Sequence, residues 1–209
     1  MIRFFGKILR GQSLARAMMN HAFCSYTISG KVVDVGGGRS PDYYDYLQKD
    51  SGYQIEPIDA SLSGIDFESD SLPHADSIAD TVICANVLEH IYNHTFLVGE
   101  MHRIMKEEAR LIGFVPFLVN YHPDPHDYFR YTEEALRKIF NTAGFRDVEI
   151  TMVGAGPFAV NFNNITLSMP YIARIFVFPV YTFVDWLFVM LRPDSRRRYP
   201  LGYAFSMRK

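Results

Sequence analysis

A run of β-branched residues that ends in three consecutive glycines sets the tightest limit on the fold of this 209-residue chain. The run Lys31–Val35 predicts a buried strand. Gly36, Gly37 and Gly38 follow directly, and glycines allow a sharp turn and a close approach of the backbone to a ligand. Asp59 ends the next predicted strand about 20 residues later, where a carboxylate can accept hydrogen bonds from both ribose hydroxyls of a nucleoside. These residues predict a nucleoside-binding site at the carboxyl ends of two strands.

The spacing of the glycines excludes two common nucleotide-binding motifs. Counted from Gly36, a dinucleotide fingerprint requires a glycine where Pro41 stands. No lysine follows the glycines as in G-K-[ST], so a phosphate-binding P-loop is excluded as well. The loop therefore suits a nucleoside with a non-phosphate tail, and a nicotinamide-dependent oxidoreductase is a distant alternative.

Strand-like and helix-like segments alternate along the rest of the chain. Apolar runs predict strands at Lys31–Val35, Tyr53–Ile58, Ala79–Ala85, Arg110–Val115, Phe145–Val153 and Tyr199–Met207. Periodicity and capping residues predict helices at Pro41–Lys49, His94–Lys106 and Thr132–Thr142. The alternation predicts the α/β class, with a mostly parallel sheet and helices on both faces. The last two strands are expected to form an antiparallel, hairpin-like edge, and no linker divides residues 1–209 into two domains.

Composition limits the partners and the compartment. The chain has 21 Lys and Arg against 23 Asp and Glu, a balance that argues against a nucleic-acid binder. Its two cysteines, Cys24 and Cys84, exclude a disulfide scaffold and favour a reducing compartment, so we expect a cytoplasmic protein.

The N-terminal residues 1–24 are basic and amphipathic. Ile2, Phe5, Ile8 and Leu9 fit one helical face, which predicts a helix that packs on the domain. A transit peptide or an interfacial anchor is the alternative, and no apolar run of signal-peptide length follows the basic residues.

The segment Pro170–Leu191 is the most apolar of the chain and belongs to a predicted helical insertion at residues 160–195. Arg174, Pro179 and Asp185 interrupt it, which argues against a transmembrane span. A helical stripe of Phe183, Trp186, Leu187 and Met190 is followed by Arg192 and Arg196–Arg198. The favoured interpretation is a flap buried against the domain. Two alternatives remain open. One is a homodimer face, and the other is an interfacial helix near anionic lipid, which would make residues 170–198 a peripheral membrane contact.

Five segments in order resemble the class I S-adenosylmethionine-dependent methyltransferases of the type 11-like group. VVDVGGGRS resembles their motif I, and the other segments are Ile58–Ser61, Ser71–Ile91, Phe96–Phe117 and Thr132–Ile150. The resemblance covers Lys31–Val153 and, as a last strand, residues 199–208. The segments GRSP and HDYFRYT look most like bacterial enzymes that act on glycans or other cell-envelope intermediates.

The resemblance implies a Rossmann-like, seven-stranded sheet with one antiparallel edge strand, and S-adenosyl-L-methionine as the cofactor. It implies a cofactor-binding core at residues 31–153. The methionine tail would meet Asp34, Gly36, Gly37 and Gly38, with Asn86 on the same side. The ribose would meet Asp59 and Ala60, and the adenine would lie near Glu68, with Asp66 as the alternative.

The acceptor is expected to meet a loop rich in titratable and aromatic residues, Asn120–Thr132, directly after a predicted strand. His126 is the first candidate for a general base, with Asp127 orienting it, and His122 is the second. Arg130 could clamp a phosphate or carboxylate of the substrate.

Structural roles are the alternatives on the acceptor side. Asp127 and Arg130 could pair while Tyr128, otherwise a substrate contact, packs in the loop. His90, after the strand Ala79–Ala85, could face the substrate or cap the next helix. We expect no bound metal, although His122, Asp124 and His126 offer ligand atoms.

The function expected from these residues is O-methylation of a small molecule, a glycan or a cell-envelope intermediate. An oxygen acceptor requires removal of its proton, which is the reason for seeking a base. One alternative is methylation of a lipid or quinone-type substrate presented at a membrane. The other is a cofactor-binding pseudoenzyme that serves as a partner subunit.

Overall fold

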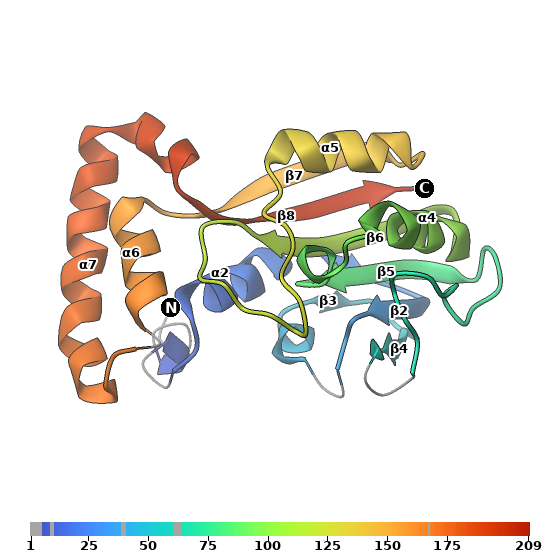
Figure 1. The fold of residues 1–209 in the computed structure, drawn as a ribbon, viewed down its shortest axis with the longest axis horizontal. Coiled ribbons are helices and arrows are strands. Elements are labelled where there is room, and N and C mark those ends of the chain that lie inside the picture. The colour runs from blue at the N-terminus through green and yellow to red at the C-terminus, as the bar shows by residue number, and fades with distance from the viewer. Residues whose placement is uncertain (1–5, 9–10, 39–40, 61–63, 167) are drawn as a thin grey trace.

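The computed structural model describes residues 6–8, 11–38, 41–60, 64–166 and 168–209, and it is built around one six-stranded sheet (Figure 1). The strand order is β4 (Gln54–Ile58), β2 (Lys31–Val35), β5 (Ala79–Ala85), β6 (Met105–Pro116), β8 (Pro200–Arg208) and β7 (Arg146–Gly154). The first four strands are parallel, and β8 is antiparallel to both of its neighbours. The predicted Rossmann-like α/β class, with a mostly parallel sheet flanked by helices, is confirmed.

The sheet differs from the expected one in the position of its antiparallel strand. β8 pairs with β6 on one side and with β7 on the other, so β7 forms the edge. The prediction that the last two strands pair antiparallel is confirmed, but the last strand is not at the edge. Within the described residues the main sheet has six of the seven expected strands, and a separate pair is formed by β1 (Thr27–Ile28) and β3 (Gln48–Lys49).

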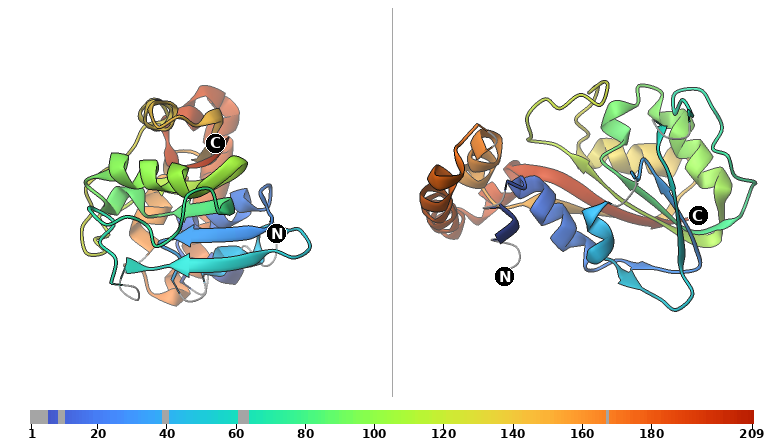
Figure 2. Two further views of the ribbon diagram at one scale, coloured as in Figure 1. Left: turned by 90° about the vertical axis from the view of Figure 1, so that its right-hand side faces the viewer. Right: turned by 90° about the horizontal axis from the view of Figure 1, so that it is seen from below.

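Side chains alternate between the two faces of the sheet, as a period-2 pattern requires. Val33 and Val35 of β2 face a core that includes α4 (His94–Ile104) and α5 (Glu133–Thr142). Val32 faces the opposite core, which is formed with α2 (Leu14–Phe23). Helices therefore cover both faces, as the two views of Figure 2 show. This arrangement leaves the carboxyl ends of the parallel strands to form a site.

The predicted helix Pro41–Lys49 is wrong. The chain forms a short 3-10 turn, η1 (Asp42–Asp45), and then the strand β3. The hydroxyl groups of Tyr43 and Tyr44 each donate a hydrogen bond of 2.6 Å to the buried Asp34 carboxylate. A regular helix would not bring these two adjacent side chains to one carboxylate, because neighbouring residues point in different directions.

The other predicted helices are confirmed with small changes at their ends. α5 begins at the predicted cap, where the Thr132 hydroxyl accepts a hydrogen bond from the backbone of Ala135, and its chain turns away at Gly144 with a φ of 97°. α4 ends at Ile104, two residues before the predicted end, because β6 begins at Met105.

The described part of the N-terminal segment packs on the domain. The Ser13 hydroxyl caps α2, which lies against β7, β8 and α6 (Pro157–Thr166). Ile8 is fully buried, whereas Ile2, Phe5 and Leu9 of the predicted apolar face lie outside the described residues.

The apolar insertion between β7 and β8 forms α6, α7 (Tyr171–Leu191) and the turn η3 (Pro193–Arg198). α6 and α7 lie at one end of the molecule, with α6 between α7 and the sheet (Figure 1). The expected buried flap is wrong, because only 11% of the most apolar window of α7 is buried. Pro179 does not break the helix, and among the described helices α7 alone is long and apolar enough to cross a membrane.

Candidate functional site

A cavity of about 600 Å³ opens at the carboxyl ends of β2, β5 and β6. Gly36 and Gly38 line it from the loop after β2, and Asn86 lines it from the end of β5. His90 and His122 line the other side, after β5 and β6. The cavity therefore joins three of the predicted cofactor residues to part of the predicted acceptor loop.

The turn Gly36–Gly38 has no room for a side chain at its first two positions. Gly36 has a φ of 79°, and its backbone N–H donates a hydrogen bond of 2.7 Å to the carbonyl of Ile58, which ties the turn to the end of β4. A Cβ atom on Gly36 would collide with Val87, and a Cβ atom on Gly37 would collide with the Asp34 carboxylate. A Cβ atom on Gly38 would lie 3.7 Å from Oδ2 of Asp59.

Asp34 is a fully buried carboxylate beside this turn. Its Oδ2 atom accepts hydrogen bonds from Tyr43 and Tyr44, while Oδ1 has no hydrogen-bond partner among the described residues. Burial raises the pKa of Asp34 to about 7, against the opposing effect of the two tyrosine hydroxyls. A buried carboxylate oxygen without a partner, beside the glycine turn, fits the ammonium group of a cofactor tail.

The other predicted cofactor residues divide into two groups. Asp59 and Ala60 follow β4 directly, and Asp59 lies beside the glycine turn. Asn86 adopts a φ of 56° at the end of β5 and lines the cavity. The oxygens of Glu68 instead accept 2.6 Å hydrogen bonds from the backbone of Tyr92 and Asn93, at the start of α4, so a structural role accounts for this carboxylate.

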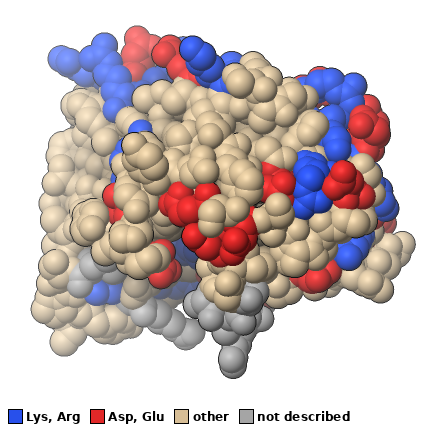
Figure 3. All heavy atoms as spheres, turned by 45° about the vertical axis from the view of Figure 1, so that its right-hand side comes forward, with Lys and Arg blue, Asp and Glu red and all other residues tan. Residues whose placement is uncertain are grey.

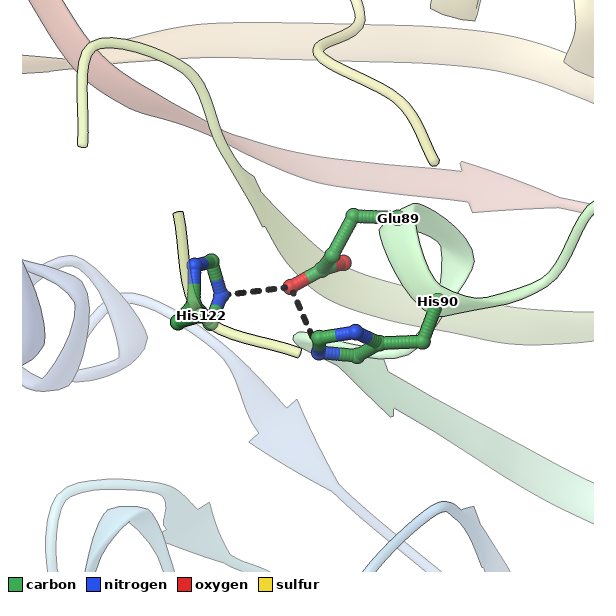
Figure 4. A group of neighbouring side chains, drawn as sticks. All are labelled: Glu89, His90 and His122. Atoms are coloured by element: carbon green, nitrogen blue, oxygen red, sulfur yellow. Dashed lines mark ion pairs between the residues drawn. The ribbon is translucent and has the colours of Figure 1, made fainter. Parts of the chain in front are cut away.

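The acceptor end of the cavity is built around Glu89, which the sequence analysis did not single out. Its side chain is fully buried, yet neither carboxylate oxygen accepts a hydrogen bond from a described residue. Nε2 of His90 lies 3.6 Å and Nε2 of His122 lies 3.7 Å from its Oε1 atom, as Figure 4 shows. The sequence offered one signal, an acidic residue directly before His90 and shortly after the predicted strand Ala79–Ala85.

Both imidazoles are oriented by backbone carbonyls. Nδ1 of His122 lies 2.9 Å from the carbonyl of Asn120, and Nδ1 of His90 lies 2.5 Å from the carbonyl of His126. Because a carbonyl only accepts, each of these contacts is a hydrogen bond in the tautomer that has its proton on Nδ1, and Nε2 of that tautomer is the nitrogen that can accept a proton. Glu89 raises the pKa of His122 above its ordinary value, with smaller contributions from Asn120 and Asp127.

Asp127 does not orient His126, which corrects the prediction for this pair. The Asp127 carboxylate binds both Nη atoms of Arg130 and accepts a 3.0 Å hydrogen bond from the backbone of His122. The guanidinium holds the pKa of Asp127 at about 2. Arg130 is thus bound within the loop and is not a free clamp for a substrate anion.

His126 and Tyr128 lie away from the cavity. The exposed His126 ring packs against the Tyr128 ring at 5.1 Å, and neither side chain lines the space that His90 and His122 share. The first candidate for the base is therefore misplaced. His122, the second candidate, reaches the cavity wall, and His90 faces the cavity and does not cap α4.

The same cluster contains the ligand atoms of a metal site. Those of Glu89, His90 and His122 lie within 4.8 Å of one another, which one ion could bridge. The set considered from the sequence was His122, Asp124 and His126, of which the structure brings only His122 to this cluster. A proton acceptor and a metal ligand would use the same Nε2 atoms, so the two roles exclude each other.

The fold and the cavity place the chain among α/β proteins whose site lies at the carboxyl ends of parallel strands. A family described as methyltransferase domain matches residues 16–150, and the chain belongs to this family. No significant match is found among curated proteins.

Solved structures share the fold at low sequence identity. The [4+2]-cyclase SpnF is 16% identical with a TM-score of 0.57, covering 94% of this chain and 80% of that one. A SAM-dependent methyltransferase from Archaeoglobus fulgidus is 16% identical with a TM-score of 0.53, covering 100% and 99%. The 1,6-didemethyltoxoflavin-N1-methyltransferase of Burkholderia thailandensis, solved with S-adenosylhomocysteine, is 15% identical with a TM-score of 0.50, covering 97% and 78%.

The chain is an enzyme, an S-adenosylmethionine-dependent methyltransferase, and S-adenosyl-L-methionine is its cofactor. The glycine turn and the unpartnered Asp34 oxygen fit the methionine part of this cofactor, and the Asp59 carboxylate lies beside Gly38 of the same turn. When bound, the cofactor supplies an electrophilic methyl group on a sulfonium.

Proposed function

We propose that this methyltransferase transfers the methyl group to a hydroxyl oxygen, and that Nε2 of His122 accepts the hydroxyl proton. The observation that carries the proposal is the buried Glu89 carboxylate with Nε2 of His122 3.7 Å away at the cavity wall. A hydroxyl is a weak nucleophile until its proton is removed, whereas the neutral thioether leaving group needs no acid. The proton moves to Nε2, and Glu89 stabilises the imidazolium that forms.

Polar residues supply part of the cavity wall, beside apolar ones such as Met19, Phe114 and Val119. Side chains of Ser13, Arg16, Asn120, Tyr121, Asp124 and Asn163 line it beside the histidines. Arg16 is paired with Asp42 at 3.0 Å, so the positive charge here is already balanced. Hydroxyl and amide groups bind polyhydroxylated molecules through paired hydrogen bonds, which supports a small glycan or glycan precursor as the acceptor.

An exchange of the two candidate bases tests the proposal. Release of S-adenosylhomocysteine is measured with a panel of glycosides and phenols as acceptors. His122→Ala is expected to lower kcat by about 10²–10⁴-fold, the usual contribution of a general base, with S-adenosylhomocysteine affinity unchanged. His126→Ala is the matched control in the same loop, and its rate is expected to stay within about twofold of the wild type.

The pH profile separates a base from a residue that only shapes the cavity. Because a base must be neutral, kcat/KM for the acceptor, measured at saturating cofactor, rises with pH through the raised pKa of His122. Glu89→Gln removes the largest cause of that shift, so the rise moves to lower pH. The proposal is overturned if His126→Ala shows the loss instead, or if activity requires a divalent ion that a chelator removes.

A further inference from the structure

The outward face of α7 is a large apolar surface without a partner among the described residues. Only Phe178 and Asp185 of its 21 residues are buried. Phe176 and Leu191 are each 70% exposed, and Trp186 is 59% exposed. Ile172, Val180 and Phe183 add to the same surface. Soluble monomers rarely expose an apolar patch of this kind unless it binds something.

Both charged residues of α7 point away from this face. Oδ1 of Asp185 accepts hydrogen bonds of 2.9 and 3.1 Å from the backbone of Phe158 and Ala159, which caps the start of α6. Nε of Arg174 donates to the carbonyl of Met169 at 3.0 Å. The outward face therefore carries no charge. On the inward face, the ring centroids of Phe178 and of Phe162 in α6 lie 4.9 Å apart. α7 is held along the surface of the domain and is not free to cross a bilayer.

A cluster of exposed arginines adjoins the end of this helix. Arg192 directly follows α7, and Arg196, Arg197 and Arg198 lie in η3, with Asp194 as the one acidic residue of that turn. Figure 3 shows Lys and Arg atoms at the upper corner of the side toward α7, above a mostly uncharged area. An apolar helix face beside a group of arginines is the arrangement of helices that lie in the interface of anionic membranes.

We propose that the outward face of α7 and the arginines of η3 form a docking surface for an anionic lipid bilayer. The apolar side chains would enter the region between headgroups and acyl chains, and the guanidinium groups would bind lipid phosphates. This inference goes beyond the proposed function, because it concerns the place where the enzyme works and holds whichever acceptor atom is methylated.

A second cavity favours a lipid over a second copy of the chain as the occupant. It measures about 540 Å³ and lies under α7, between α2 and α6. Apolar side chains such as Leu14, Phe162 and Trp186 line it, and Arg196 stands in its wall. Asp185 also lines it, but its Oδ1 atom is bound to the backbone of α6, so a mostly apolar cavity with a guanidinium in its wall fits an acyl chain with an anionic headgroup.

The only tryptophan of the chain reports directly on this face. Purified full-length enzyme is mixed, without any acceptor, with vesicles of phosphatidylcholine alone or with one third phosphatidylglycerol. We expect Trp186 emission to shift to shorter wavelength and the protein to float with the anionic vesicles only. High salt is expected to weaken this binding, because it screens the arginine–phosphate attraction.

Two matched variants test the role of the arginines. R196Q/R197Q/R198Q is expected to bind anionic vesicles about 100-fold more weakly, from three lost cationic contacts. K49Q/R137Q/K138Q removes the same charge from exposed positions elsewhere and should bind as the wild type does. Unchanged S-adenosylhomocysteine binding shows that each variant is folded and keeps the cofactor site separate from this test.

Two results would overturn the proposal. One is a shift of Trp186 emission that depends on protein concentration without lipid, together with a dimer in light scattering, which would make this face a subunit interface. The other is the absence of flotation with either type of vesicle. F176S/F183S/L191S is a further check, since the loss of three exposed apolar side chains should abolish the emission shift without unfolding the core.

Discussion

The two ends of the catalytic cavity are built in different ways. At the cofactor end, backbone geometry dominates, because strand ends, the glycine turn and the carboxylates of Asp34 and Asp59 follow one another closely along two neighbouring strands. At the acceptor end, contacts of side chains hold the loop in place. Nδ1 of His90 meets the carbonyl of His126, 36 residues later, and Asp127 binds Arg130 within the loop. The first end is fixed by the sheet, and the second depends on a loop that must be held in place.

This difference predicts different responses to substitution. Changes at the cofactor end should alter the affinity for the cofactor without moving the loop. Changes at the acceptor end should alter turnover, and some should also alter stability, since the loop residues hold each other. The predictions below test this division, from the largest expected effect to the smallest.

Asp59→Ala is expected to weaken S-adenosylhomocysteine binding about 100-fold, measured by calorimetry. The loss corresponds to about 2.7 kcal/mol, within the range for hydrogen bonds to a charged group. Glu68→Gln is the control, because the Glu68 oxygens are already bound to the backbone of Tyr92 and Asn93. Equal losses in both variants would contradict the assignment of the ribose contact to Asp59.

The affinity for S-adenosylhomocysteine is expected to increase about tenfold between pH 6 and pH 8. The pKa of Asp34 is raised to about 7 by burial, so the carboxyl is mostly protonated at pH 6. The ammonium group of the cofactor favours the ionised form, and below pH 7 its binding must displace the Asp34 proton. Calorimetry at a series of pH values measures this, and Asp34→Asn should flatten the profile. A profile that keeps its slope in Asp34→Asn would assign the proton to another group.

The sequence predicted the two strands and the glycine turn well because the information for them is local. A β-branched strand, consecutive glycines and an acidic residue after the next strand specify neighbouring positions in any parallel sheet. Gly36 and Gly38 accordingly line the cavity, and the Asp34 carboxylate lies against Gly37. Glu68 shows the limit of this reasoning, since a capping interaction with the start of α4 cannot be recognised from spacing alone.

The acceptor end was predicted less well because several residues of one type lie close together in the loop. His122 and His126 are four residues apart, and only the bond between Asp127 and Arg130 and the path of the loop decide which ring reaches the cavity. The position of α7 was missed for a related reason. An aromatic stripe shows that one helix face is apolar, but it does not show whether protein covers that face.

Arg130→Lys is expected to have the smallest effect, a loss of about 1 kcal/mol of stability, or 2–4 °C in Tm for a chain of this size. Lysine keeps the charge but cannot bind both Asp127 oxygens at once, so the backbone of His122 loses its support. We expect kcat to fall several-fold while S-adenosylhomocysteine affinity stays constant, measured by thermal unfolding, turnover and calorimetry. Arg137→Lys, on the exposed face of α5, is the matched control. A loss of cofactor affinity in Arg130→Lys would mean that the two ends of the cavity are coupled through this loop and do not respond separately.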